Sequence, residues 1–133
     1  MNRLSGHISA IEVCGSMSLV TIDISSTIHL KTIIIETPET ASYLLAGNPV
    51  QAVFKETEVI IGTDETHNIS LQNRLPGQII TIESGKLISK IAISTEAGII
   101  VSIISTNAVN SLNLQKDLRV IAMIKLNEIM LSA

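Results

Sequence analysis

The chain opens with the stretch Asn2–Ile8 (NRLSGHI), and nearly the same stretch returns as Asn73–Ile79 (NRLPGQI). Seven of the eleven positions from Asn2 to Glu12 are identical when the chain is compared with itself at a shift of 71 residues. A repeat of this length indicates two copies of one small fold rather than a single larger domain.

The two copies also end alike. Val50–Ile61 (VQAVFKETEVII) corresponds to Val120–Leu131 (VIAMIKLNEIML), and a lysine follows the apolar run in each copy. We therefore expect a first domain at residues 1–62, a linker at 63–69 and a second domain at 70–133.

Composition indicates how such small domains build a core. Hydrophobic residues make up 46% of the 133 residues, yet there is one Tyr, one Phe and no Trp. The core must be built from Ile, Val and Leu, and the β-branched residues among them favour sheets. Domains of about 60 residues bury too little surface to be comfortably stable alone, so we expect the copies to pack together or to form an oligomer.

Each copy reads as three strands, a short helix and two further strands. In the first copy the strands are expected at 8–11, 19–24, 28–35, 50–54 and 57–61, with a helix at 38–46. In the second they are expected at 77–83, 90–94, 99–104, 119–124 and 127–131, with a helix at 108–114 after the capping residues 105–107. This order predicts an all-β protein with short helices, made of two tandem OB-like five-stranded Greek-key β-barrels.

Two of the expected strands are apolar on both faces, at residues 32–35 and 99–104. A strand in a single small barrel should keep one face in water, so the second face needs a cover. We expect contact between the copies or between chains.

The bulk numbers exclude several function classes. A net charge of −3 and a pI near 5.5 argue against a nucleic-acid partner, and Tyr43 and Phe54 are the only aromatic residues for stacking bases. No apolar run is long enough to span a membrane. Cys14 has no partner for an internal disulfide, and no signal peptide precedes the repeat. We expect a cytoplasmic protein.

No enzyme signature is present. The chain has no glycine-rich phosphate loop, no cysteine pair and no nucleophile elbow. His7, His29 and His67 have no Asp, Glu or Cys at ligand spacing, so we expect no bare metal cation and no cofactor. The sequence therefore indicates a protein that is not an enzyme.

The polar residues that recur are more informative. Lys55 and Lys125 occupy the same place in the two copies, as do Asn2 and Asn73, and Ser70 lies three residues before Asn73. A lysine at this place is either a solvated side chain or a charge that neutralises a small anion. Asn and Ser are either turn and strand-start residues or hydrogen-bond donors for the same ligand.

The second copy, from residue 69 to 132, resembles the Mop domain (a TOBE-type domain) of the molybdate-binding proteins called molbindins. The resemblance depends on the opening at Asn73–Glu83, the short helix and the closing pattern from Ile124 to Leu131. Two such units resemble the di-Mop arrangement. The resemblance implies a homo-oligomer, a trimer or a dimer, that binds molybdate or tungstate between copies or subunits. It implies storage, buffering or sensing of the oxyanion in molybdenum homeostasis.

The resemblance also implies which residues hold the ligand. Gln72 stands where the family has Arg, and Leu126 with Asn127 replaces a pair of small residues. An alternative interpretation is therefore an OB-like oligomerisation or effector module of a regulator or transporter, with a weakened or lost site. The expected oxyanion-binding residues are Ser70, Gln72, Asn73, Ser105, Lys125, Leu126, Asn127, Asn2 and Lys55.

Overall fold

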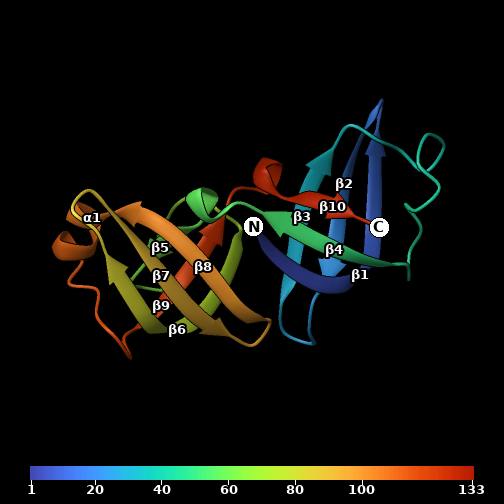
Figure 1. Cartoon of the computed structure of the whole chain (residues 1–133). Coiled ribbons are helices and arrows are strands. Elements are labelled where there is room, and N and C mark those ends of the chain that lie inside the picture. The colour runs from blue at the N-terminus through green and yellow to red at the C-terminus, as the bar shows by residue number, and fades with distance from the viewer.

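The computed structural model describes all residues from 1 to 133 and contains two five-stranded antiparallel sheets (Figure 1). The first copy supplies β1 (Asn2–Cys14), β2 (Met17–Asp23), β3 (His29–Ile34), β4 (Pro49–Phe54), η1 (Glu56–Glu58) and β5 (Ile60–Gly62). The second supplies β6 (Asn73–Ser84), β7 (Ile88–Thr95), β8 (Gly98–Ser105), α1 (Thr106–Ser111), β9 (Arg119–Ile124), η2 (Leu126–Glu128) and β10 (Met130–Ser132). The predicted all-β class is confirmed.

The two sheets are built in the same way. Their strand orders are β10-β4-β1-β2-β3 and β5-β9-β6-β7-β8. The long strand of each copy pairs along its first half with β4 or β9 and along its second half with β2 or β7. Each long strand has a register shift at the same place, between Ile8 and Ala10 and between Ile79 and Thr81. Such an irregularity bends a strand, which lets one strand serve two parts of a curved sheet.

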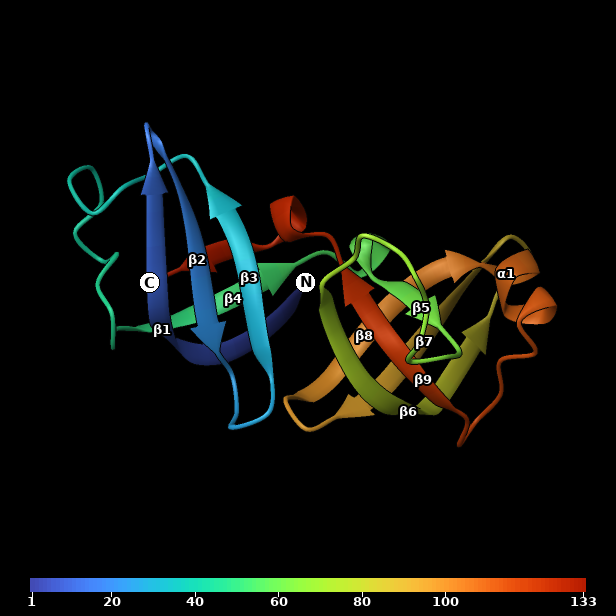
Figure 2. The ribbon, with the colours of Figure 1, turned by 180° about the vertical axis from the view of Figure 1, so that it is seen from behind.

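The two copies exchange their last strands. β5 ends the first copy but pairs with β9, and β10 ends the second copy but pairs with β4 (Figures 1 and 2). Each sheet therefore has the five strands expected from the sequence, and the fifth comes from the other copy. We call the folded unit around β1 the first body and the unit around β6 the second body.

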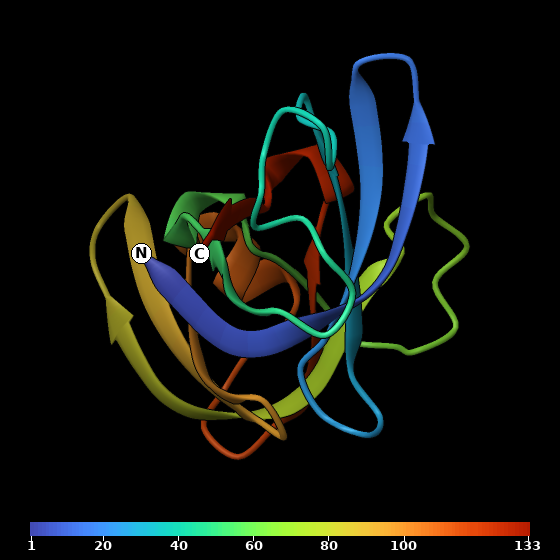
Figure 3. The same cartoon turned by 90° about the vertical axis from the view of Figure 1, so that its right-hand side faces the viewer.

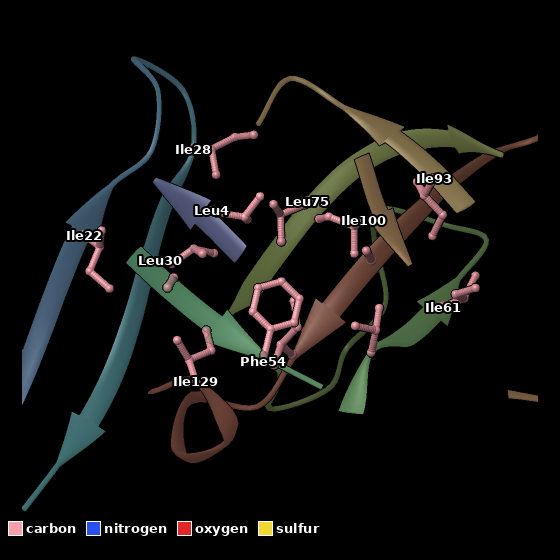
Figure 4. Close-up of a cluster of buried hydrophobic side chains, with 14 of the residues drawn as sticks. Leu4, Ile22, Ile28, Leu30, Phe54, Ile61, Leu75, Ile93, Ile100 and Ile129 are labelled. Atoms are coloured by element: carbon pink, nitrogen blue, oxygen red, sulfur yellow. The ribbon is translucent and has the colours of Figure 1, made fainter. Parts of the chain in front are cut away.

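One continuous core joins the two bodies. A cluster of 24 buried hydrophobic residues includes Leu4 and Leu30 of the first body and Leu75 and Ile100 of the second. Phe54, the only phenylalanine, is fully buried among them, close to Ile129 (Figure 4). The bodies share this core, so we expect them to fold as one unit.

The short-helix predictions had different outcomes. In the second copy α1 begins at Thr106 after the N-cap Ser105, whose side chain accepts a hydrogen bond from the Ala108 amide. The helix predicted at 38–46 is wrong, because these residues form turns. The Thr40 hydroxyl accepts from the Thr37 amide, and such local hydrogen bonds compete with helix formation.

Two segments project from the bodies. The β1–β2 hairpin extends beyond its sheet, and the linker between β5 and β6 forms a loop on the outside of the second body (Figure 3). Every helix in the structure is too short to cross a lipid bilayer.

Candidate functional site

The recurring asparagines hold the two bodies together. The Asn73 side chain accepts from the Lys31 amide and donates to the Lys31 carbonyl, both at 2.8 Å. The Asn2 side chain makes the same pair of bonds to Val101, at 2.8 and 2.9 Å. Lys31 lies in β3 and Val101 in β8, which are edge strands of the two sheets. Each asparagine thus provides hydrogen-bond partners for an N–H and a C=O group that an edge strand would otherwise leave unpaired.

Two hydroxyl groups repeat this symmetric arrangement. Thr32 in β3 donates to the Ile129 carbonyl at 2.6 Å, and Ser102 in β8 donates to the Val59 carbonyl at 2.8 Å. Both hydroxyl groups are buried. Residues that recur between the copies therefore have a structural role at the junction. After these bonds each asparagine amide keeps one N–H hydrogen for another acceptor.

Both recurring lysines stand at the start of a short 3-10 helix. Lys55 precedes η1 and Lys125 precedes η2, and both side chains are exposed and form no hydrogen bond within the chain. The two 3-10 helices lie near the junction, on the same side of the molecule (Figures 1 and 2). The predicted position at the end of an apolar strand is confirmed by β4 and β9.

The strand register brings part of the expected site together. Asn73 pairs with Ile124 in the β6–β9 ladder, so Gln72 and Lys125 follow as neighbours just beyond its end. Ser70 lies two residues further along the linker. The side chains of Ser70, Gln72 and Lys125 make no hydrogen bond within the chain, which leaves their donors free.

The remaining expected residues are spread over other parts of the molecule. Asn127 is exposed and Leu126 half-buried in η2, directly after Lys125. Ser105 caps α1 at the outer end of the second body, away from η2 (Figure 1). Within one chain, the structure does not bring Ser105 together with Lys125. Asn2 and Lys55 form the corresponding pair in the first body, because Asn2 pairs with Phe54.

The two lysine positions differ in their local charge. Glu58 Oε2 lies 3.4 Å from the Lys55 backbone nitrogen, and Met1 places its amino group 2.9 Å from Glu56. Glu128, the counterpart of Glu58, makes no hydrogen bond to the Lys125 amide, and Leu126 stands in the place of Glu56. A carboxylate beside an amide competes with an incoming anion, which favours Lys125 over Lys55 as an anion site.

The structure shows no arrangement of three or more His, Cys, Asp or Glu side chains that would hold a metal ion. His7, Asp23 and His29 lie side by side on β1, β2 and β3, but both imidazoles contact the carboxylate, at 3.8 and 2.6 Å. The His29 contact, with help from Ser9, lowers the pKa of Asp23 below its ordinary value of 3.8. This row is a surface hydrogen-bond cluster.

The larger hollows of the surface lie elsewhere. Three hollows of about 470 Å³ lie beside the β6–β7 turn, beside the end of α1, and beside the β1–β2 turn, and one of about 220 Å³ lies between the bodies beside Arg74 and Arg119. None of these hollows is lined by Ser70 or Lys125, so these donors lie on an open surface in the single chain. Sequence reasoning did not single out Arg74, whose side chain binds the linker that carries Ser70. Its visible signals were its place directly after Asn73 and its recurrence as Arg3 in the first copy.

Comparison with known proteins gives a consistent result. Residues 69–131 match the family model of the TOBE domain. A crystal structure of the cytoplasmic molybdate-binding protein ModG, in a form with molybdate bound, superposes with a TM-score of 0.89 at 27% identity. The alignment covers 99% of this chain and 95% of that one.

A structure of MopII from Clostridium pasteurianum matches with a TM-score of 0.48 at 25% identity, covering 50% of this chain and 100% of that one. No protein with a curated description matches the sequence. The match to ModG runs through both bodies and includes their connection. Residues 69–131 therefore form a TOBE domain, and the chain has the tandem Mop fold of ModG, which confirms the fold expected from the resemblance.

Proposed function

We propose that the chain is a cytoplasmic binding protein for tetrahedral oxyanions, molybdate or tungstate, and not an enzyme. The observation that carries the proposal is the match to molybdate-bound ModG over 99% of the chain. ModG is a binding protein, and the likeness extends to the strands and turns that present the recurring lysines. Storage, buffering or sensing of the oxyanion is the role that follows from binding without catalysis.

The site that we propose is centred on Lys125. The Lys125 ammonium supplies charge, and Ser70, Gln72, Asn127 and the free N–H of Asn73 supply neutral donors. Leu126 contributes its backbone amide, and Ser105 of a neighbouring copy completes the set. Hydrogen bonds to a charged ligand are about twice as strong as neutral ones, so this set suits a dianion although Gln72 lacks a positive charge.

Exposed apolar side chains favour an assembly of several chains. Ile69 beside Ser70 is 48% exposed, and Met130 close to η2 is 47% exposed. Ile35, Leu87 and Ile99 are more exposed still. Exposed apolar residues that gather in one continuous patch mark a contact surface. We propose a homo-oligomer, a dimer or a trimer, in which a second chain covers the open Lys125 surface. Lys55 and Asn2 form the corresponding, weaker position.

Isothermal titration of the purified chain with molybdate, tungstate, sulfate and phosphate tests the proposal. Molybdate and tungstate should bind, and phosphate should bind more weakly. Phosphate is partly protonated at neutral pH, and a pocket made of donors leaves its O–H without an acceptor. Absence of binding by all four oxyanions would refute the proposed function.

A second function follows from Gln72 in the place of the family's arginine. The chain would then be an oligomerisation or effector module of a molybdate-responsive regulator or transporter, with a weakened oxyanion site. Light scattering alongside the titration separates the two functions. An oligomer that binds no oxyanion favours the module, and an oligomer that binds molybdate favours the binding protein.

A further inference from the structure

The linker between β5 and β6 is wrapped around one side chain, that of Arg74. Arg74 donates four hydrogen bonds to linker carbonyls: Nε to Leu71 at 2.8 Å, Nη1 to Glu65 at 3.2 Å, and Nη2 to His67 at 2.8 Å and to Ile69 at 3.3 Å. A guanidinium group has five N–H donors in a planar fork, so four of the five are used here.

The four carbonyls belong to every second residue of the linker. Four carbonyls can reach one guanidinium only if the backbone curves around it, and the linker turns at residues 65–66 and bends at residues 69–70. The linker therefore curves around the guanidinium from residue 65 to residue 71. Other contacts fix its beginning, where the Asp64 amide donates to His67 Nε2 and the Thr66 amide donates to the Asp64 carboxylate.

Arg74 thereby fixes the backbone on both sides of Ser70. The neighbours of Ser70 are Ile69 and Leu71, and both of their carbonyls bind Arg74. Gln72 lies between Leu71 and Asn73, and the Asn73 side chain is hydrogen-bonded to the Lys31 backbone. The two linker donors beside Lys125 are thus flanked by anchored residues on each side.

We propose that Arg74 is a positioning residue for oxyanion binding, which it supports by ordering Ser70 and Gln72 rather than by touching the ligand. The inference rests on the proposed function. A free linker would have to be ordered when the ligand binds, and prior ordering removes that cost from the binding free energy. Four of the five N–H groups of the Arg74 guanidinium donate to the linker. Arg74 therefore does not replace the family's arginine, whose place Gln72 takes.

The repeat supplies a matched control. Arg3 is the counterpart of Arg74 at the same place in β1, and its exposed side chain makes no hydrogen bond in the structure. Arg3→Gln and Arg74→Gln remove the same charge from equivalent places. Arg74→Lys keeps the charge, but one ammonium group cannot reach four carbonyls.

The test combines molybdate titration with amide hydrogen exchange on the full-length chain. We expect Arg74→Gln and Arg74→Lys to weaken molybdate binding about tenfold, the scale found when the orienting partner of a ligand group is lost. Exchange in residues 63–72 should accelerate in both variants. Arg3→Gln should change neither quantity.

Three results would overturn the inference. Faster exchange with unchanged molybdate affinity would leave Arg74 a purely structural role, even if the melting temperature falls. Full affinity in Arg74→Lys would show that charge and not geometry matters. Absence of oxyanion binding by the unmodified chain would refute the proposed function and this role with it, and the unmodified chain is titrated first to separate that case.

Discussion

The two copies share one fold but differ at their openings. Asn2 and Asn73 make the same pair of hydrogen bonds across the junction, and Thr32 and Ser102 repeat a second pair. The residues around the lysines differ: Glu58 lies beside the Lys55 amide, and the Arg74-bound linker lies beside Lys125. The recurring asparagines thus belong to the junction, whereas the differences around the recurring lysines mark where one copy is better suited to bind an anion.

The largest effect should come from the shared core. Leu4 and Leu75 are equivalent and almost fully buried in one cluster. Leu4→Ala and Leu75→Ala should each lower the free energy of unfolding by about 2–5 kcal/mol. Since the cluster spans both bodies, each variant should unfold in a single transition, measured by urea denaturation. Two separate transitions would show that the bodies are independent.

The two recurring lysines should differ in their contribution to oxyanion binding. A partly desolvated contact between an ammonium group and a dianion resembles a charged hydrogen bond, so Lys125→Met should weaken molybdate binding by about 1.5–3 kcal/mol, roughly ten- to a hundredfold. Lys55→Met should cost much less. Comparable losses in the two variants, measured by isothermal titration, would favour a site in which both lysines take part. No loss in either would refute the anion role of both.

Loss of either asparagine at the junction should lower the stability of the protein by the same amount. Asn2→Ala and Asn73→Ala each leave the amide and carbonyl of one edge-strand residue without partners. A lost buried partner costs about 1–3 kcal/mol, so each variant should lose that much stability in chemical denaturation. A much smaller loss for one variant would break the symmetry of the junction and point to a different role for that asparagine.

The smallest effect concerns acid stability. The His29 contact lowers the pKa of Asp23, so the stabilisation is present above the ordinary value of 3.8 and disappears as the pH falls through the lower, folded-state pKa. The second body has Ser94 at the corresponding place. Asp23→Ser should therefore make the melting temperature less dependent on pH below about pH 4. An unchanged pH profile would show that this surface cluster contributes nothing.

The sequence predicted the copies, the all-β class and a cap among residues 105–107, because each leaves a local signal, whereas the helix predicted at 108–114 lies at Thr106–Ser111. It missed the turns at residues 38–46, where hydrogen bonds between Thr37 and Thr40 outweigh the helical pattern. The exchange of β5 and β10 has no local signal, because the residue pattern of a strand is the same whichever sheet the strand joins.

The candidate site was only partly visible in the sequence. The register of β6 and β9 brings Gln72 beside Lys125, and the sequence had grouped these two through a resemblance. The sequence also placed Ser105 in the site, although α1 lies at the outer end of the second body. Arg74 went unnoticed because its importance depends on where the linker folds back, which spacing along the chain does not show.

The proposed function depends above all on binding of a tetrahedral oxyanion beside Lys125. A crystal structure of the chain with tungstate, located by the anomalous scattering of tungsten, tests this claim most directly. We predict a tungstate ion whose oxygens lie within hydrogen-bond reach of Lys125 Nζ and Ser70 Oγ, with a second chain closing the site. Tungsten found only at other places, or none bound in a crystal that contains millimolar tungstate, would contradict the account.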